Sequence, residues 1–178
     1  MPDTVAVERH GAVTFQGNAL TAVGPELHVG NAAPTFTLTN GEMGSTSLAD
    51  LSANGSKAVL LVVVPSLDTP VCALEADTFH KRSSELPESV VMAVVSRDLP
   101  FAQARWANAT DATALTLLSD FRERTFGPAY GVEVKELGLL ARSVFVIDKH
   151  GKLAHAELVK EISDQPDYDA VFDAVNRL

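Results

Sequence analysis

An unbroken run of apolar, mostly branched residues occupies positions 58–64 (Ala-Val-Leu-Leu-Val-Val-Val), directly after Lys57. The stretch 57–64 has the length of a strand, and because polar residues do not alternate within it, it is typical of a strand covered on both faces. Pro65 ends the run, a polar loop follows, and apolar residues then recur at helical spacing over 71–85. This segment predicts a central strand followed by a helix, which is the building unit of an α/β fold.

The rest of the chain continues this alternation of strands and helices. Turn residues and periodicity predict an N-terminal β-hairpin (13–15 with 20–23), strands at 35–39, 90–96 and 115–118, helices at 100–107, 121–126 and 166–178, and a second hairpin (143–148 with 152–159). Residues 44–55 are predicted to form a loop with one helical turn. The order predicts a three-layer α/β sandwich of the thioredoxin type, with a mixed central sheet and an N-terminal hairpin. With no repeat or long linker, we expect residues 1–178 to form a single domain.

Within the expected helix 71–85, apolar residues mark the face that should be buried. Val71, Leu74 and Phe79 are assigned to this inner face. Charged residues are assigned to the outer face: Glu75, Asp77, Lys81 and Arg82.

The net charge and the N-terminal residues limit which partners and which cellular compartment we expect. Lys and Arg number 14 against 23 Asp and Glu, a net charge of −9, which disfavours nucleic acid and anionic membranes as partners. The longest apolar stretch is too short to cross a bilayer. Residues 1–10 carry three charged residues and no apolar core, so they resemble neither a signal peptide nor a transit peptide. We expect a soluble cytoplasmic protein.

Cys72 is the single cysteine, which excludes an internal disulfide, a Cys-x-x-Cys pair and multi-cysteine metal sites. The five histidines show no pair at i, i+4 spacing, so we expect no metal and no cofactor. Cys72 falls in the first turn of the expected helix, where free backbone N–H groups and the helix dipole favour a thiolate. A buried, inert cysteine is the alternative.

Pro65, Thr69 and Cys72 form the spacing Pro-x-x-x-Thr-x-x-Cys across the expected strand-to-helix turn. A hydroxyl three residues before the thiol can point to the same place as the first-turn N–H groups. A peroxide held there would lie in line for attack by the sulfur, with hydrogen-bond donors stabilising the charge that develops on the departing oxygen. Alternatively, Thr69 only caps the helix.

Several further motifs occur in a fixed order along the chain: Phe-Gln-Gly-Asn at 15–18, Ala-Pro-Thr-Phe-Thr-Leu-Thr at 33–39, Leu-Asp-Thr-Pro-Val-Cys at 67–72, Ser-Arg-Asp-Leu-Pro-Phe-Ala-Gln at 96–103, and Gly-Leu-Leu-Ala-Arg-Ser-Val-Phe-Val-Ile-Asp at 138–148. From Val13 onward the chain resembles the bacterial thiol peroxidases, an atypical two-cysteine subfamily of the peroxiredoxins. The resemblance implies a thioredoxin-like fold, a homodimer, and reduction of hydrogen peroxide and organic hydroperoxides in antioxidant defence. Thioredoxin or another thiol would be the reductant.

The same resemblance assigns individual residues. Cys72 matches the peroxidatic cysteine, Pro65 and Thr69 match the residues that shield the site and bind peroxide, and Arg142 matches the active-site arginine. A guanidinium suits this role because it stays charged and donates several hydrogen bonds at once.

The chain departs from the subfamily at Ala107, where a resolving cysteine is expected, 107 − 72 = 35 residues after Cys72. A sulfenic acid on Cys72 cannot condense with an alanine, so turnover would need an external thiol. A natural one-cysteine variant and an engineered Cys-to-Ala form both account for Ala107. The alternative function is a thioredoxin-like protein that uses Cys72 for thiol exchange or glutathione binding.

Overall fold

The computed structural model describes residues 7–113 and 115–178. Residues 1–6, part of the N-terminal segment predicted to be neither a signal peptide nor a transit peptide, lie outside the described residues. Along the described chain the elements are β1 (Glu8–Phe15), β2 (Asn18–Val23), β3 (Thr37–Thr39), β4 (Ser45–Ser47), α1 (Leu48–Leu51), β5 (Ala58–Val63), α2 (Pro70–Lys81), a 3-10 turn η1 (Arg82–Glu85), β6 (Val90–Ser96), α3 (Pro100–Ala109), β7 (Thr116–Ser119), α4 (Phe126–Ala129), β8 (Glu133–Val134), β9 (Leu139–Leu140), β10 (Ser143–Ile147), β11 (Leu153–Leu158) and α5 (Tyr168–Asn176).

The main sheet has the strand order β11-β10-β5-β6-β7-β3-β4. Strands β5, β6 and β7 are parallel, whereas β10 pairs antiparallel with β5 and β3 pairs antiparallel with β7. All six residues of β5 are buried. The expected mixed sheet with a doubly covered central strand is therefore confirmed.

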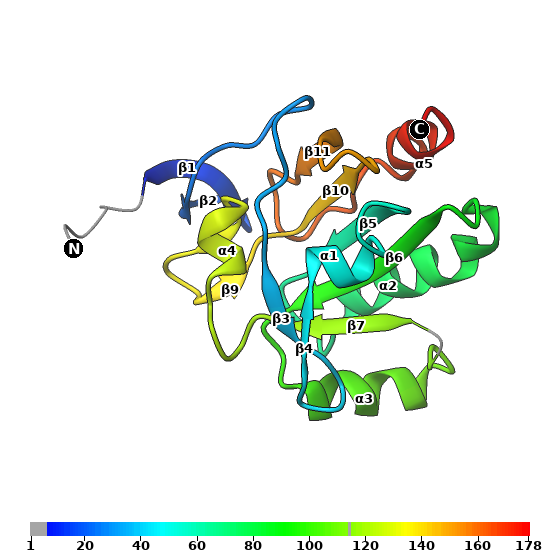
Figure 1. Ribbon diagram of the computed structural model, residues 1–178. Helices are drawn as coiled ribbons and strands as arrows, with labels where there is room; N and C mark the ends of the chain where they lie inside the picture. The colour runs from blue at the N-terminus through cyan, green and yellow to red at the C-terminus, as the bar shows by residue number, and fades with distance from the viewer. Residues whose placement is uncertain (1–6, 114) are drawn as a thin grey trace.

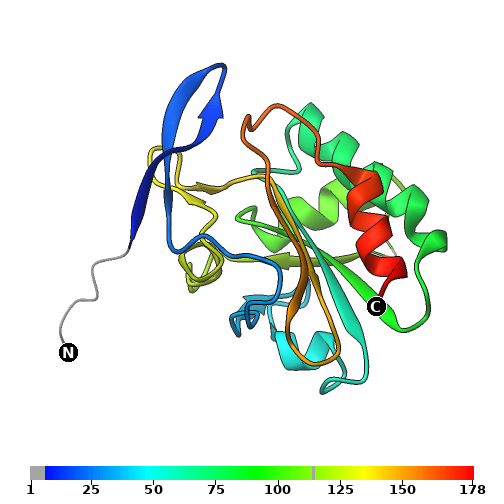
Figure 2. The same ribbon diagram turned by 90° about the horizontal axis from the view of Figure 1, so that it is seen from above.

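Successive residues of β5 point to opposite faces of this sheet and so divide the core in two. Val59 and Leu61 pack into a cluster with α1, α4 and a second sheet, whereas Leu60 and Val62 pack against α2, α3 and α5. Figures 1 and 2 show the resulting layers, with α2 and α5 together on one side of the main sheet. Burial of each such side chain contributes roughly 1.5–3 kcal/mol.

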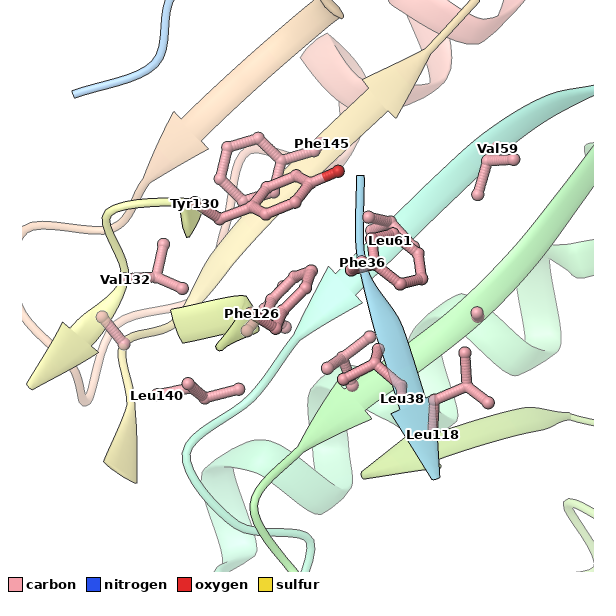
Figure 3. Close-up of a cluster of buried hydrophobic side chains, with 14 of the residues drawn as sticks. Phe36, Leu38, Val59, Leu61, Leu118, Phe126, Tyr130, Val132, Leu140 and Phe145 are labelled. Carbon is pink, nitrogen blue, oxygen red and sulfur yellow. The ribbon is translucent and has the colours of Figure 1, made fainter. Parts of the chain in front are cut away.

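Aromatic rings fill the first of these two clusters (Figure 3). Phe126 and Tyr130 stack with ring centroids 4.4 Å apart, and Phe36 meets Phe126 edge to face at 5.5 Å. The phenol of Tyr130 donates a hydrogen bond to the Pro34 carbonyl, which satisfies its polar end. This cluster packs the main sheet against α1, α4 and the second sheet.

The second sheet has the order β1-β2-β8-β9. The expected N-terminal hairpin is confirmed, and it turns at Gln16 and Gly17, both with positive φ, as tight hairpin turns require. Strands β8 (Glu133–Val134) and β9 (Leu139–Leu140) were not predicted from the sequence. Each is only two residues long, which is too short to show a periodic pattern.

Two local predictions were wrong. The predicted helix 121–126 instead begins at Phe126 and continues through Gly127 and Pro128, because the Asp120 carboxylate accepts hydrogen bonds from the Phe126 and Gly127 N–H groups and so fixes the start of α4. The predicted loop 44–55 contains the expected helical turn, α1, but also a strand, β4, that pairs with β3.

No helix in the described residues combines the length and apolarity that a bilayer span requires.

Candidate active site

The register of β5 and β10 brings distant parts of the chain together. Ser143, the first residue of β10, lies opposite Val63, the last residue of β5. Arg142 precedes β10, and the loop from Val64 to Thr69 leads from β5 into α2. The antiparallel pairing thus carries Arg142 to the beginning of α2, where Cys72 lies.

Cys72 occupies the first turn of α2. Thr69 is the N-cap and Pro70 the first helical residue, a position where its missing N–H costs nothing. The N–H groups of Val71 and Cys72 have no partner within the helix and lie on the positive end of its dipole. Cys72 is only 1% exposed.

Arg142 joins Cys72 to a buried carboxyl group. Its Nη2 donates to Cys72 Sγ at 3.3 Å, its Nη1 donates to Glu75, and its Nε donates to the Ile162 carbonyl at 3.0 Å. Glu75 and Arg142 are both fully buried, so this ion pair and the thiol share a site shielded from solvent. Among the described residues, Glu75 Oε1 has no hydrogen-bond partner.

Glu75 corrects the sequence analysis, which assigned it to the outer face of the helix and Leu74 to the inner one. Leu74 is 56% exposed, whereas Glu75 lies three residues after Cys72 on the buried face. A charged residue can occupy this face because Arg142, which directly precedes β10, forms an ion pair with it. The signal available in the sequence was the i, i+3 spacing from Cys72, which puts the two side chains on one helical face.

Burial sets the electrostatics of the pair. Desolvation raises the pKa of Glu75 to about 7, against the opposing charge and hydrogen bond of Arg142. Burial also opposes the charged form of Arg142, but Glu75 and Cys72 outweigh it, so its pKa is raised. The arginine therefore stays a cation beside the sulfur, while the carboxyl group can change its charge near neutral pH.

Pro65 and Thr69 lie at the two ends of the loop that leads from β5 into the helix of Cys72. Pro65 is buried just beyond β5, and Thr69 is exposed at the start of α2. The Thr69 hydroxyl donates to the Ser66 carbonyl at 2.9 Å and makes no side-chain cap to the helix, so the capping interpretation is wrong. Its oxygen can still accept a hydrogen bond from a bound molecule.

Asp98, the third residue of the motif at 96–103, ties the loop before α2 to the end of β6. Its carboxylate accepts from the Ser66 hydroxyl at 2.7 Å, the Leu67 N–H at 2.8 Å and the Ser96 hydroxyl at 2.8 Å. The parallel pairing of β5 and β6 puts both loops at the same edge of the sheet. Asp98 thus holds the loop that carries Thr69.

A sequence model of the Redoxin family ("Redoxin") matches residues 28–172. The chain belongs to the Redoxin family. It is 42% identical to the thiol peroxidase of Bacillus subtilis (strain 168) over 93% of this chain and 97% of that protein. It is also 44% identical to the thiol peroxidase of Listeria monocytogenes serotype 4b (strain F2365), over 93% of this chain and 98% of that protein.

Among solved structures, this Redoxin-family chain is similar to a peroxiredoxin-like protein from Aquifex aeolicus. The two share 39% sequence identity and a TM-score of 0.85, and the match covers 97% of this chain and 98% of the other. The predicted thioredoxin-like fold and the resemblance to the thiol peroxidases are thereby confirmed.

In this Redoxin-family chain, Ala107 lies on α3 and is buried in the same apolar cluster as Cys72. Within the described residues, no group of three or more His, Cys, Asp or Glu side chains is arranged to hold a metal ion. A large cavity of about 830 Å³ lies elsewhere, lined by β3, α1 and the turn after β10, near the end of β5 remote from Cys72.

Proposed function

We propose that Cys72 is the peroxidatic thiol of a thiol-dependent peroxidase that reduces hydrogen peroxide and organic hydroperoxides. The observation that carries the proposal is the contact of the Arg142 guanidinium with Cys72 Sγ, at 3.3 Å, inside a buried site at a helix N-terminus. A fixed cation and free N–H groups favour the thiolate, which is the nucleophilic form. An inert structural cysteine would need none of these groups.

Peroxide reduction at this site transfers one oxygen atom to Cys72. The Cys72 thiolate attacks one peroxide oxygen, an S–O bond forms, and the O–O bond breaks. The second oxygen takes up the proton that the thiol lost on ionising and leaves as water or an alcohol, and Cys72 becomes a sulfenic acid. Arg142 and the Cys72 N–H stabilise charge on the oxygens, Thr69 orients the peroxide, and Pro65 limits the entry of water.

Recycling then depends on a thiol from outside the chain, because Ala107 supplies no sulfur. We infer that thioredoxin or another thiol reduces the sulfenic acid, in the cytoplasm, where such reductants keep Cys72 reduced. We propose further that the chain forms a homodimer and that it acts in antioxidant defence.

The deciding experiment treats the reduced chain with one equivalent of hydrogen peroxide and follows the intact mass. We expect a product one oxygen atom heavier, with the modification on Cys72 and trapping by a sulfenic-acid reagent. The Cys72→Ser variant is the control and should keep its mass. Unmodified Cys72 would contradict the proposal.

Two variants separate peroxide reduction from simple thiol exchange. Thr69→Val and Arg142→Ala should each lower the rate with peroxide by about 100-fold, because both groups act on the peroxide oxygens. Their reaction with glutathione disulfide should fall less than their reaction with peroxide. Fast exchange with the disulfide together with slow oxidation by peroxide in the unaltered chain would instead favour thiol exchange.

A further inference from the structure

The segment 159–163, which follows β11, holds Arg142 at two points. The Val159 N–H donates to the Arg142 carbonyl at 2.9 Å, and the Ile162 carbonyl accepts from Arg142 Nε at 3.0 Å. A guanidinium is planar, so fixing Nε fixes the directions of Nη1 and Nη2. The place of the Ile162 carbonyl therefore decides whether Nη1 faces Glu75 and Nη2 faces Cys72.

The N-terminal hairpin keeps that segment in place. Thr14 of β1 donates its N–H to the Lys160 carbonyl at 2.7 Å and accepts the Ile162 N–H at 2.9 Å. Figure 2 shows the loop after β11 reaching toward the hairpin. The hairpin is thus two hydrogen bonds away from the guanidinium, through Ile162.

Glu161 fastens the two segments together with both of its oxygens. Oε2 accepts from the Thr14 hydroxyl at 2.8 Å and from the Gly17 N–H at 3.1 Å. Oε1 accepts from the Gln16 N–H at 3.1 Å and from the Ser163 hydroxyl at 2.7 Å. These hydrogen bonds, that from Ser163 above all, lower the pKa of Glu161 to about 2, so it is a carboxylate at all physiological pH values.

We propose that Glu161 is a positioning residue of the peroxidase site: by locking segment 159–163 to the hairpin tip, it makes the Ile162 carbonyl hold the Arg142 guanidinium against Cys72. The proposal rests on the proposed function for its effect on peroxide reduction. It gives the hairpin, which contributes no group to the site itself, a part in the chemistry.

The variant that tests this is Glu161→Gln, which keeps the shape of the side chain. Glu161 Oε1 accepts three hydrogen bonds and Oε2 accepts two. An amide must present an N–H₂ group in place of one oxygen, so the backbone N–H of either Gln16 or Gly17 in the hairpin loses its acceptor. The matched control is Glu136→Gln. Glu136 accepts the Thr21 N–H of the same hairpin, at 2.9 and 3.1 Å, and within the described part of the chain no hydrogen bond joins it to segment 159–163.

Two rates are measured in both variants and in the unaltered chain: oxidation of Cys72 by hydrogen peroxide, and its alkylation by iodoacetamide as a function of pH. We expect Glu161→Gln to slow oxidation by about tenfold, as misplacement of a catalytic group does. Its alkylation profile should move to higher pH, because the thiolate loses the nearby cation. Glu136→Gln should stay within about twofold of the unaltered chain.

Equal losses in the two variants, or a Glu161→Gln rate equal to that of the unaltered chain, would overturn the proposal. If Glu161→Gln unfolds, Thr14→Val removes a single donor and should show a smaller change in the same direction. An unaltered chain that fails to react with peroxide would contradict the proposed function, whereas the alkylation profiles would still decide whether Glu161 positions Arg142.

Discussion

Glu75 places a carboxyl group where solvent cannot reach it, with one oxygen paired to Arg142 and the other unpartnered among the described residues. Leaving a buried acceptor unsatisfied costs about 1–3 kcal/mol, so packing alone does not favour a glutamate here. Its charge, however, controls how much of the Arg142 field reaches Cys72. When Glu75 is protonated, the guanidinium charge at the sulfur is uncompensated.

The first prediction concerns the pH dependence that Glu75 imposes. The folded-state pKa of Glu75 is about 7, against an ordinary value of 4.5, so between these values the folded chain holds a proton that the unfolded chain has lost. The proton on Glu75 should therefore stabilise the folded state fully below about pH 4.5, and this stabilisation should be lost as pH rises to about 7. Glu75→Gln should remove this slope, as measured by urea unfolding across that pH range.

The same variant should alter catalysis. In the unaltered chain, ionisation of Glu75 near pH 7 should appear as a component of the pH profile of oxidation by hydrogen peroxide, and Glu75→Gln should lack it. Asp77→Asn is the control, because Asp77 lies on the same helix but forms a surface pair with Lys81. A component near pH 7 that persists in Glu75→Gln would assign it to another group.

The sequence could single out Cys72, Thr69 and Pro65 because they are neighbours across one turn. Arg142 could be assigned only through the family resemblance, since its contact with Cys72 depends on the register of β5 and β10. Glu75 was misplaced for a related reason. A hydrophobic pattern fixes the rotation of a helix only when charges are solvated, and the partner that permits burial of Glu75 lies 67 residues away.

At the scale of elements, the loop between β5 and α2 depends on Asp98 for its shape. Removing the negative charge with Asp98→Asn replaces one acceptor oxygen by a donor, so the Ser66 hydroxyl or the Leu67 N–H loses its partner. We expect a loss of about 1–3 kcal/mol in the free energy of unfolding and slower oxidation by peroxide. A variant that loses stability but oxidises at the original rate would show that the loop does not position Thr69.

Helix α3 gives a second prediction at this scale, because Ala107 occupies the expected resolving position. In Ala107→Cys, the product of the reaction with peroxide should be an internal disulfide instead of a sulfenic acid. Neither cysteine should then react with alkylating reagents. Repeated turnover with thioredoxin should then rise. A sulfenic acid that persists in this variant would indicate that the introduced thiol cannot reach Cys72.

The long elements followed from the sequence, whereas three of the shortest strands did not. Strands β5, β6 and β10 are continuous apolar runs, and α2, α3 and α5 have helical periodicity, so their order was enough to predict the layers. Strands β4, β8 and β9 span two or three residues, and they form because neighbouring strands offer hydrogen-bond partners. Such pairing depends on the assembled fold, which no local pattern encodes.

For the whole molecule, the main sheet and the hairpin sheet are joined by a second buried arginine, Arg97, at the end of β6. It donates to Asp120 at 3.2 Å, to Glu133 of β8 at 3.0 Å and to the Gly138 carbonyl before β9 at 2.9 Å. Its side chain is 4% exposed, and that of Asp120 is fully buried. One guanidinium thus holds together the two sheets that frame Arg142.

Arg97→Ala should therefore destabilise the fold by about 3–5 kcal/mol, because it leaves the Asp120 carboxylate buried without its cation. Burial already raises the pKa of Asp120, although the Phe126 and Gly127 N–H groups and Arg97 oppose the shift. Without Arg97 the pKa of Asp120 should rise further, so the loss should be larger at neutral pH than at acidic pH, where the carboxyl group binds a proton.

Urea unfolding of Arg97→Ala and Arg105→Ala measures the difference directly. Arg105 also pairs with an aspartate, Asp68, but its side chain is 70% exposed, so its removal should cost no more than about 1 kcal/mol. Equal losses would contradict the structural role of Arg97. A large loss confined to Arg97→Ala would show that stability of the whole molecule depends on the junction between the sheets, next to the strand that delivers Arg142 to Cys72.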